Sequence, residues 1–325
     1  MARSPKFGVF VPQGWKMDLV EIEDPVEKYE AMTAAASAAD AEATIDSIWV
    51  YDHFHTTPEP TLETTFECWT ISATLARDTE RVRIGQMVGC NGYRNPALFA
   101  KIASTVDVAS NGRLDAGIGA GWYEHEWLAY GYGFPDAPER LRMLREACQV
   151  IHAMWRDDYA TVEGKRYQIN GAINEPKGVQ QPHVPLWIGG GGEQVTLKLV
   201  AQYGDACNVG AGNPQTCRHK LDVLRRHCDT VGRDYDEIIK STSLDLLLLE
   251  DGADRDAAIE ANRQGWTFER FGNQFLVGGV DDAAERIERL LEAGIEYVIV
   301  YLPRVAYDHT SLQRLAREVL PRFAS

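Results

Sequence analysis

Eight short runs rich in β-branched and aromatic residues recur along this chain, each followed by a longer segment. Most of these segments space their apolar residues three and four positions apart, which buries one face of a helix. Strands that alternate with such crossover helices run parallel. The pattern therefore predicts an α/β fold, a (β/α)8 TIM barrel, with a doubly wound open sheet as the alternative. The predicted strands are Phe7–Val11, Ser47–Asp52, Val82–Val88, Leu114–Gly119, Pro185–Gly190, Asp205–Gly210, Ser241–Leu249 and Tyr297–Leu302.

The helical spacing predicts seven helices, and no stretch reads as a linker that would split the chain. We therefore expect a single domain over residues 1–325. The predicted helices are 26–43, 67–78, 96–110, 139–155, 196–203, 216–231 and 283–293.

Two irregular stretches interrupt the alternation. Residues 156–184 are polar and rich in glycine and proline, and we expect them to form an insertion over the C-terminal mouth of the barrel. Residues 252–275 carry aromatic side chains at Trp266, Phe268, Phe271 and Phe275. This second stretch either covers a substrate pocket or forms a helix that packs against the barrel.

Composition and charge exclude several classes of partner. The formal net charge of −15 disfavours nucleic acid and anionic membrane surfaces, both of which attract basic clusters. No apolar run approaches the roughly 20 residues that span a bilayer. The six cysteines are scattered without a CxxC pair, and the N-terminus has no signal-peptide pattern, so we expect a cytoplasmic protein with reduced thiols.

Polar and glycine-rich residues cluster where the predicted strands end, which is where TIM barrels carry their reactive groups. Gly117, Gly119 and Gly121 lie in one such turn, and Gly189, Gly190, Gly191 and Gly192 form another. Glycine-rich turns before a helix expose N–H groups that bind phosphate, which suggests an anionic cofactor or substrate. A single GxG is equally consistent with an ordinary tight turn, and the spacing matches neither the dinucleotide-binding fingerprint nor the phosphate loop of NTPases.

The second predicted strand ends in Asp52-His53-Phe54-His55. An Asp-His pair at a strand end positions a ligand or exchanges a proton near neutral pH, and the alternative is a structural hydrogen-bonded corner. His53 and His55 lack a third ligand at metal-binding spacing, so we predict no metal site. No GxSxG motif is present, and acyl transfer is therefore not favoured.

Five blocks in preserved order resemble the bacterial luciferase-like flavin and deazaflavin oxidoreductases. The similarity runs from the first strand to the final helix. CNGYRNPALFAK, GAGW and GGGGE make the chain most similar to the branch that uses coenzyme F420, a deazaflavin hydride carrier. The five blocks are SIWVYDHFH, ECWTISATLARDTERVRIGQMV, YRNPALFAKIASTVDVASNGRLDAGIGAGW, ERLRMLREACQVIHAMW and PLWIGGGGE.

The resemblance implies a deazaflavin ring in the barrel mouth and a non-prolyl cis peptide at Met87-Val88 that supports the ring. It further implies that His53 handles a proton and that a small organic substrate exchanges a hydride with the ring. Family members often form homodimers. The implied cofactor-binding residues are Asp52, Met87, Val88, Gly119, Trp122, His125, Gly189, Gly190, Gly191 and Gly192.

One departure from the family matters for the substrate. In the sugar-phosphate dehydrogenase branch a proton-transferring glutamate follows the glycine turn, and Trp122 stands there in this chain, with His125 in place of an asparagine that contacts phosphate. Glu126 matches an acidic position of the family. The alternatives are an FMN-dependent monooxygenase that uses molecular oxygen, since FMN has a similar ring and a phosphate, and a barrel that has lost its chemistry and serves as a binding subunit.

Overall fold

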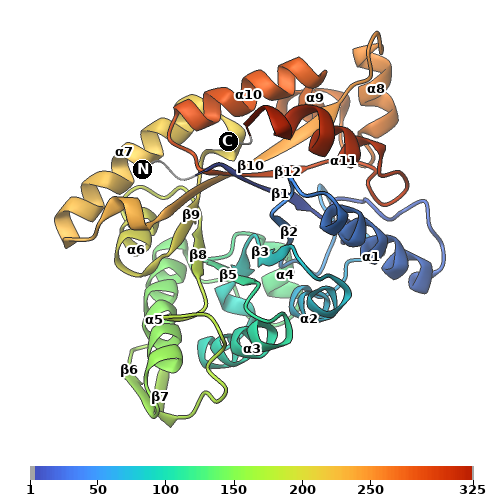
Figure 1. Ribbon diagram of the computed structural model, residues 1–325. Coiled ribbons are helices and arrows are strands. Elements are labelled where there is room, and N and C mark those ends of the chain that lie inside the picture. Colours follow the sequence, from blue (N-terminus) through green and yellow to red (C-terminus); the bar gives the residue numbers. More distant parts are fainter. Residues whose placement is uncertain (1–3, 324–325) are drawn as a thin grey trace.

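Eight parallel strands close on themselves in the computed structural model, which describes residues 4–323 (Figure 1). Strand β1 pairs with β2 on one side and with β12 on the other, and the pairing of β9 with β10 completes the ring. This closure confirms the predicted barrel and rules out the open sheet. The barrel strands are β1 (Lys6–Phe10), β2 (Ser47–Val50), β3 (Arg83–Gln86), β5 (Leu114–Gly119), β8 (Leu186–Gly189), β9 (Ala206–Asn208), β10 (Ile239–Leu248) and β12 (Tyr297–Tyr301).

Helices surround the barrel, and all seven predicted helices are present with ends shifted by a few residues (Figure 1). The crossover helices α3 and α7 begin at Asn-Pro, where the asparagine side chain accepts from a first-turn N–H and the proline fixes the first helical turn. The helices are α1 (Pro25–Ala41), α2 (Cys68–Asp78), α3 (Pro96–Ala109), α4 (Glu124–Ala129), α5 (Ala137–Arg156), α6 (Thr196–Tyr203), α7 (Pro214–Val231), α8 (Arg255–Asn262), α9 (Phe268–Gln274), α10 (Val280–Glu292) and α11 (Thr310–Arg314).

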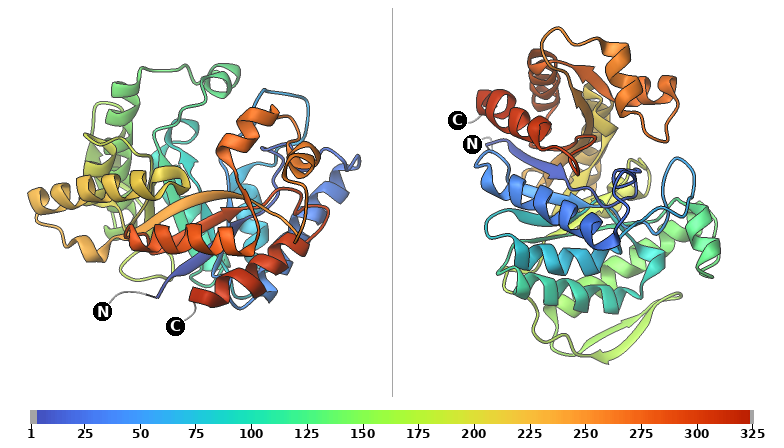
Figure 2. Two further views of the ribbon diagram at one scale, coloured as in Figure 1. Left: turned by 90° about the horizontal axis from the view of Figure 1, so that it is seen from above. Right: turned by 90° about the vertical axis from the view of Figure 1, so that its right-hand side faces the viewer.

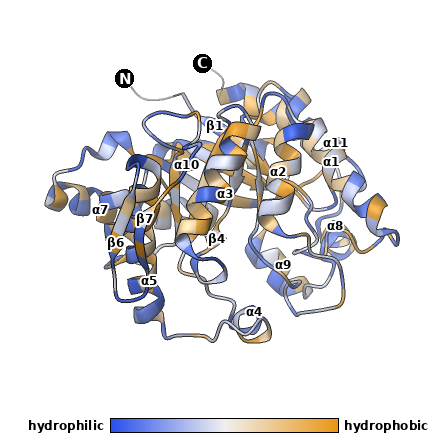
Figure 3. Ribbon diagram, turned by 90° about the horizontal axis from the view of Figure 1, so that it is seen from below, coloured by the Kyte–Doolittle hydropathy of each residue, from blue (hydrophilic) through white to orange (hydrophobic). Residues whose placement is uncertain are grey.

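Large aromatic side chains fill the inside of the barrel. The ring of Trp49 lies 4.7 Å from that of Trp187, which in turn lies 5.3 Å from Tyr297. Gly8 and Gly85, on the strands either side of Trp49, leave room for its indole, since a Cβ on Gly85 would stand 2.3 Å from the ring. A second apolar layer fills the space between strands and helices, and hydrophobic residues mark the helices in Figure 3 in alternation with hydrophilic ones.

The segment 156–184 does not lie where the sequence analysis expects it. It forms an antiparallel hairpin of β6 (Ala160–Glu163) and β7 (Gln168–Ala172), followed by a strap along α3. Gln180 bonds Asp107 at the end of α3 and the Leu114 carbonyl at the start of β5, which belong to the N-terminal end of the barrel. These hydrogen bonds tie the strap to α3 and β5, and β6 packs against α5, so the insertion lies on the outer helices and not over the mouth (Figure 2).

The mouth is covered instead by other connections. Residues 252–275 form α8 and α9 after β10, with β11 (Leu276–Gly278) returning to pair with that strand. Phe271 is buried and stacks on Phe275, while Trp266 and Thr267 line a cavity, so this stretch both packs against the barrel and covers a pocket. Helix α4 stands apart from the helix layer on long loops (Figures 2 and 3).

None of the helices within residues 4–323 combines the length and the apolar character that crossing a membrane requires.

Replacing Gly85 by alanine is expected to destabilise the protein by about 1–3 kcal/mol, because the new methyl group enters the space of the fully buried Trp49 ring. Gly272→Ala is the matched control, since a Cβ there meets its nearest neighbour at an ordinary 3.6 Å and alanine favours the helix. Urea denaturation of both variants checks the difference; equal midpoints would contradict the packing role of Gly85.

Candidate functional site

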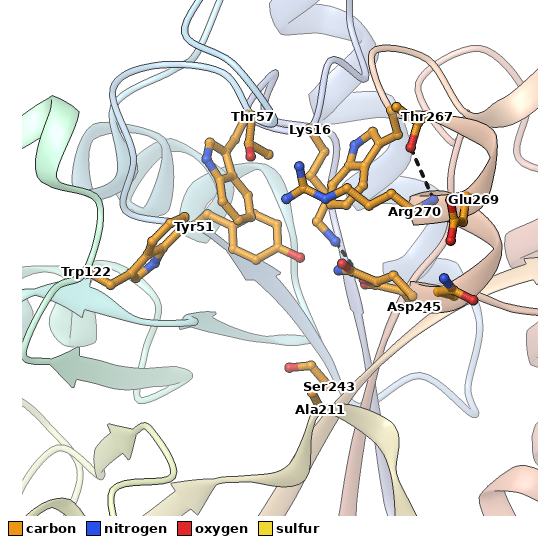
Figure 4. Close-up of a pocket in the computed structure, with 14 residues that line it drawn as sticks. Lys16, Tyr51, Thr57, Trp122, Ala211, Ser243, Asp245, Thr267, Glu269 and Arg270 are labelled. Atoms are coloured by element: carbon orange, nitrogen blue, oxygen red, sulfur yellow. Dashed lines mark hydrogen bonds and ion pairs between the residues drawn. The ribbon is translucent and has the colours of Figure 1, made fainter.

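Two adjoining cavities open at the C-terminal ends of the strands and share Trp15, Tyr51 and Trp122 as walls. The inner cavity, of about 340 Å³, lies against β3, β5 and β8. The outer cavity, of about 890 Å³, lies between β10 and α9 (Figure 4). The remaining inner lining residues include Asp52, His53, Met87, Val88, Gly89, Cys90, Tyr93, Gly119, Gly121, Gly189, Gly190, Thr196 and Asn208.

The floor of the inner cavity is a break in the third barrel strand. Strand β3 ends at Gln86, the Met87-Val88 peptide is cis, and the chain pairs with β5 again as β4 (Gly89–Cys90). The predicted cis peptide is therefore present at the predicted bond. Met87 and Val88 both line the cavity.

The glycines of the fourth strand end make room for this break. A Cβ on Gly117 would stand 1.8 Å from the Gln86 carbonyl oxygen, and Cβ atoms on Gly119 and Gly189 would each stand 2.8 Å from a methyl group of Val88. Gly121 has a φ of +80° and would meet the Cys90 sulfur at 2.5 Å. Close packing against the broken strand thus requires these glycines, whatever a ligand adds.

His53 is anchored by a buried carboxylate. Its Nδ1 lies 2.8 Å from Oε2 of Glu126, and its ring stacks on Trp15 with centroids 4.2 Å apart. Trp122 meets the same imidazole edge to face at 5.6 Å. The N–H at Nδ1 donates to the carboxylate, so Nε2 is the nitrogen left for exchange with a bound molecule.

Glu126 holds the surrounding chain as well as His53. Its Oε1 accepts from the backbone N–H groups of Phe54 and His55, at 2.6 and 2.9 Å, and its Oε2 also accepts from the Tyr93 hydroxyl at 2.6 Å. Burial acts to raise the pKa of Glu126, but the hydrogen bonds and charge of its donors outweigh it and lower the pKa below its ordinary value. The group is an ionised carboxylate that fixes the loop after β2.

Asp52 lines the inner cavity, but its carboxylate is directed at protein groups. It accepts from the Cys90 N–H at 2.7 Å and forms a two-point ion pair with Arg94, at 2.6 and 3.0 Å. Arg94 also bonds Glu67. Asp52 therefore ties β2 to the resumed strand β4, which corresponds to the hydrogen-bonded corner that the sequence left open.

Of the other predicted cofactor-binding residues, Trp122 lies at the cavities and His125 does not. Trp122 is largely exposed and walls both cavities, whereas His125 lies outside them on an exposed face, with its Nδ1 3.1 Å from Nδ1 of His55. Among residues 4–323, no group of three or more potential metal ligands comes together.

The glycine turn after β8 divides at the edge of the inner cavity. Gly189 and Gly190 line it together with Thr196, the first residue of α6, while Gly191 and Gly192 lie beyond. Val195 at the N-cap offers no side-chain acceptor to the first N–H groups of α6. A helix N-terminus of this kind attracts an anion.

The outer cavity contains charged residues that the sequence pattern does not single out. Lys16 lies 2.9 Å from Asp245 and 3.8 Å from the ring centre of Tyr301, and Gln274 donates to the same carboxylate (Figure 4). Arg270 stacks on Trp266 at 4.4 Å and extends into the cavity. The one sequence signal for this group was Asp245, an acidic residue within the apolar run SLDLLLL.

The sequence is similar to that of known proteins along most of its length. The family model of luciferase-like monooxygenases matches residues 5–297. A relative from Kineococcus radiotolerans, an F420-dependent glucose-6-phosphate dehydrogenase, is 32% identical over 219 residues, which cover 65% of this chain and 62% of the relative. A dehydrogenase of the same name from Amycolatopsis mediterranei is 25% identical over 316 residues, 86% of this chain and 91% of the relative.

Other similar proteins carry different names. The oxygenase component of a flavin-dependent trigonelline monooxygenase from Acinetobacter baylyi is 27% identical over 76% of this chain and 66% of its own. The solved structure of an F420-dependent secondary alcohol dehydrogenase superposes with a TM-score of 0.81 at 20% identity, covering 99% of this chain and all of the other, which supports the fold.

Glu126→Gln is expected to destabilise the protein by about 1–3 kcal/mol at pH 7, because an amide NH2 would face donors in place of one carboxylate oxygen. Leu128→Gln, on the exposed face of α4, is the control. Chemical denaturation measures both.

The same variant tests the charge of Glu126. A carboxyl group with a lowered pKa stabilises the fold above its unfolded-state value, near 4.5, and this contribution disappears as the pH falls through the folded-state value. The stability difference between wild type and Glu126→Gln should therefore shrink below about pH 4.5. A difference that stays constant down to pH 3 would contradict an ionised Glu126.

Proposed function

This chain belongs to the luciferase-like monooxygenase family, and from that premise we propose that it is a coenzyme F420-dependent oxidoreductase. In this proposal a hydride passes between the deazaflavin and a small organic substrate. The observation that carries the proposal is the pair of cavities that meet along Trp15, Tyr51 and Trp122, with His53 beside their boundary. One cavity suits a cofactor and the other a substrate.

The inner cavity fits a flat ring with a phosphate-bearing tail. Val88 forms an apolar floor, Trp15 and Trp122 supply aromatic walls, and Gly190 leads to the uncapped start of α6. Such a turn provides backbone N–H groups without a side chain in the way of a phosphate. When bound, the deazaflavin supplies the hydride chemistry.

The protein's own contribution is to orient the reactants, exclude water and exchange a proton. The carboxylate of Glu126 fixes the orientation of the His53 imidazole, and the indole of Trp15 stacks on the same imidazole ring. We assign His53 Nε2 as the group that takes or gives the proton that accompanies hydride transfer at the substrate. Asp52 is assigned a supporting role, since Arg94 and the Cys90 N–H occupy its oxygens.

The names of the relatives support F420 over FMN. Four similar proteins are named F420-dependent glucose-6-phosphate dehydrogenases. The second candidate, an FMN-dependent monooxygenase, has the trigonelline enzyme in its favour. A reactive oxygen-derived group needs the same exclusion of water, so the cavities alone do not separate the two cofactors.

We propose a substrate other than a sugar phosphate. The charges that line the outer cavity balance, with Lys16 and Arg270 against Asp245 and Glu269, and Lys16 is already paired. Aromatic walls at Trp15, Trp122 and Trp266 favour a molecule with a flat apolar part. A phosphate dianion would find no excess of positive charge there.

The cytoplasmic location and the homodimer remain predictions from the sequence. Size-exclusion chromatography with light scattering measures the number of copies directly.

Titration of the purified protein with coenzyme F420 and with FMN tests the proposal. We expect F420 to bind at least about tenfold more tightly, seen as quenching of cofactor or tryptophan fluorescence because Trp15 and Trp122 line the cavity. Preference for FMN, with oxygen consumed in the presence of reduced FMN, would replace hydride transfer by monooxygenation. Failure to bind either cofactor would favour the third alternative, a barrel that has lost its catalytic activity and serves as a binding subunit.

His53→Ala is expected to lower turnover about 100-fold while cofactor affinity stays within about threefold, because the imidazole exchanges a proton and Trp15 still walls the cavity. His55→Ala is the control, since His55 lies two residues away and faces His125 outside the cavities. Steady-state kinetics and the binding titration check both variants. An unchanged rate in His53→Ala would remove this residue from the mechanism.

A further inference from the structure

Helix α7 is basic in a strongly acidic protein. It carries four lysine and arginine residues and two histidines against two aspartates, whereas the whole chain has a net charge of −15. Positive charge concentrated in one place on such a molecule attracts anions locally. The first turns of α7 lie beside the glycine turn that ends the inner cavity.

Lys220 lies against that turn just beyond the cavity. Gly190 lines the cavity, and a Cβ on the next residue, Gly191, would stand 3.5 Å from Cε and 4.0 Å from Nζ of Lys220. The lysine stem therefore lies along the backbone of the turn. A ligand that left the cavity across Gly190 would therefore pass close to this ammonium group.

A carboxylate of the protein already occupies this cation. Oε1 of Glu193 lies 2.6 Å from Nζ of Lys220 and 2.9 Å from Nε2 of His219. His227 bonds the backbone carbonyl of Glu193 at 2.7 Å, so the turn itself is held against α7. The arrangement shows that Lys220 and His219 together accommodate one carboxylate group.

The side chain of Glu193 can leave its place between Lys220 and His219. Its side chain is 42% exposed, and an exposed ion pair contributes little to stability, so swinging it into solvent costs little. A ligand carboxylate would then take the same place between Lys220 and His219.

We propose that Lys220 and His219 bind a carboxylate on the tail of the cofactor, beyond its phosphate, and that Glu193 holds this site in the free protein and competes with the tail. The inference rests on the proposed function. Coenzyme F420 extends past its phosphate as a chain of glutamates, whereas FMN ends at the phosphate. The site therefore recognises the glutamate tail, which coenzyme F420 has and FMN lacks.

The contact is limited to the start of the tail. A groove of about 500 Å³ continues past His219 along α7 and α10, and Arg218 and Arg289 line it. Asp222 and Glu292 line it as well and offset these cations. The charges that line this groove cancel, so the proposed contact with the tail is limited to Lys220 and His219.

Equilibrium binding of two cofactor forms tests the inference: F420 with several glutamates, and the truncated deazaflavin that ends at the phosphate and carries no carboxylate beyond it. We expect the wild type to bind the glutamylated form about three- to fivefold more tightly at low salt, with the ratio falling towards one as salt screens the contact. Calorimetry or fluorescence measures both affinities without turnover.

Substitutions of Lys220 and of Glu193 should change the ratio of the two cofactor affinities in opposite directions. Lys220→Ala should bring the ratio of the two affinities to about one, whereas Glu193→Gln should raise it to about tenfold because the competing carboxylate is gone. Lys165→Ala, which removes the same charge from the hairpin turn between β6 and β7, should leave the ratio unchanged.

The outcomes separate this inference from the proposed function. If the wild type binds both forms equally, or if Lys220→Ala weakens both forms by the same factor, the tail site is wrong while F420 dependence stands. If neither form binds, the proposed function fails and this inference fails with it. Thermal melting of each variant confirms that the fold is retained.

Discussion

The buried carboxylate of Glu126 is the interaction on which the geometry of the mouth depends. It accepts hydrogen bonds from two backbone N–H groups after β2, from the Tyr93 hydroxyl and from His53. These donors come from the loop after β2 and from Tyr93 after β4, whereas Glu126 itself lies in α4, which stands on loops outside the helix layer. One ionised group therefore fixes the imidazole, the loop and the helix relative to one another, because a buried charge requires all its partners to stay in place.

A second constraint is the tight fit around the broken third strand. Val88 fills the space that Gly119 and Gly189 leave open, and Asp52 binds the N–H of Cys90 just beyond the break. The glycines of β5 and β8 consequently have two structural roles. They admit Val88 as a cavity floor, and at Gly190 the same backbone continues to the uncapped start of α6 and to Lys220.

The two cavities differ in how their charges are arranged. In the outer one Lys16 is neutralised by Asp245 beneath aromatic rings, so recognition there relies on shape and apolar contact. Beyond the inner cavity, at the glycine turn, the cation Lys220 is paired with an exposed glutamate that a ligand can displace. The buried Lys16–Asp245 pair is a fixed part of the cavity wall, because separating two buried charges is costly. The more exposed Lys220–Glu193 pair can exchange one partner for a ligand, because water solvates the displaced carboxylate.

The sequence by itself determined the eight strands, the seven main helices and the strand ends that carry His53 and the glycine turns, because periodicity and turn residues act over short distances. The cis bond at Met87-Val88 was expected only from the resemblance to a family, and the structure decided that the sheet closes into a barrel. Only the tertiary structure decided the partners of buried charges. Glu126 meets His53 across 73 positions and Lys16 meets Asp245 across 229, contacts that exist only once the barrel closes. The same holds for residues 156–184, whose polarity marks an insertion, while hydrogen bonds to Asp107 and Leu114 direct it to the outer helices.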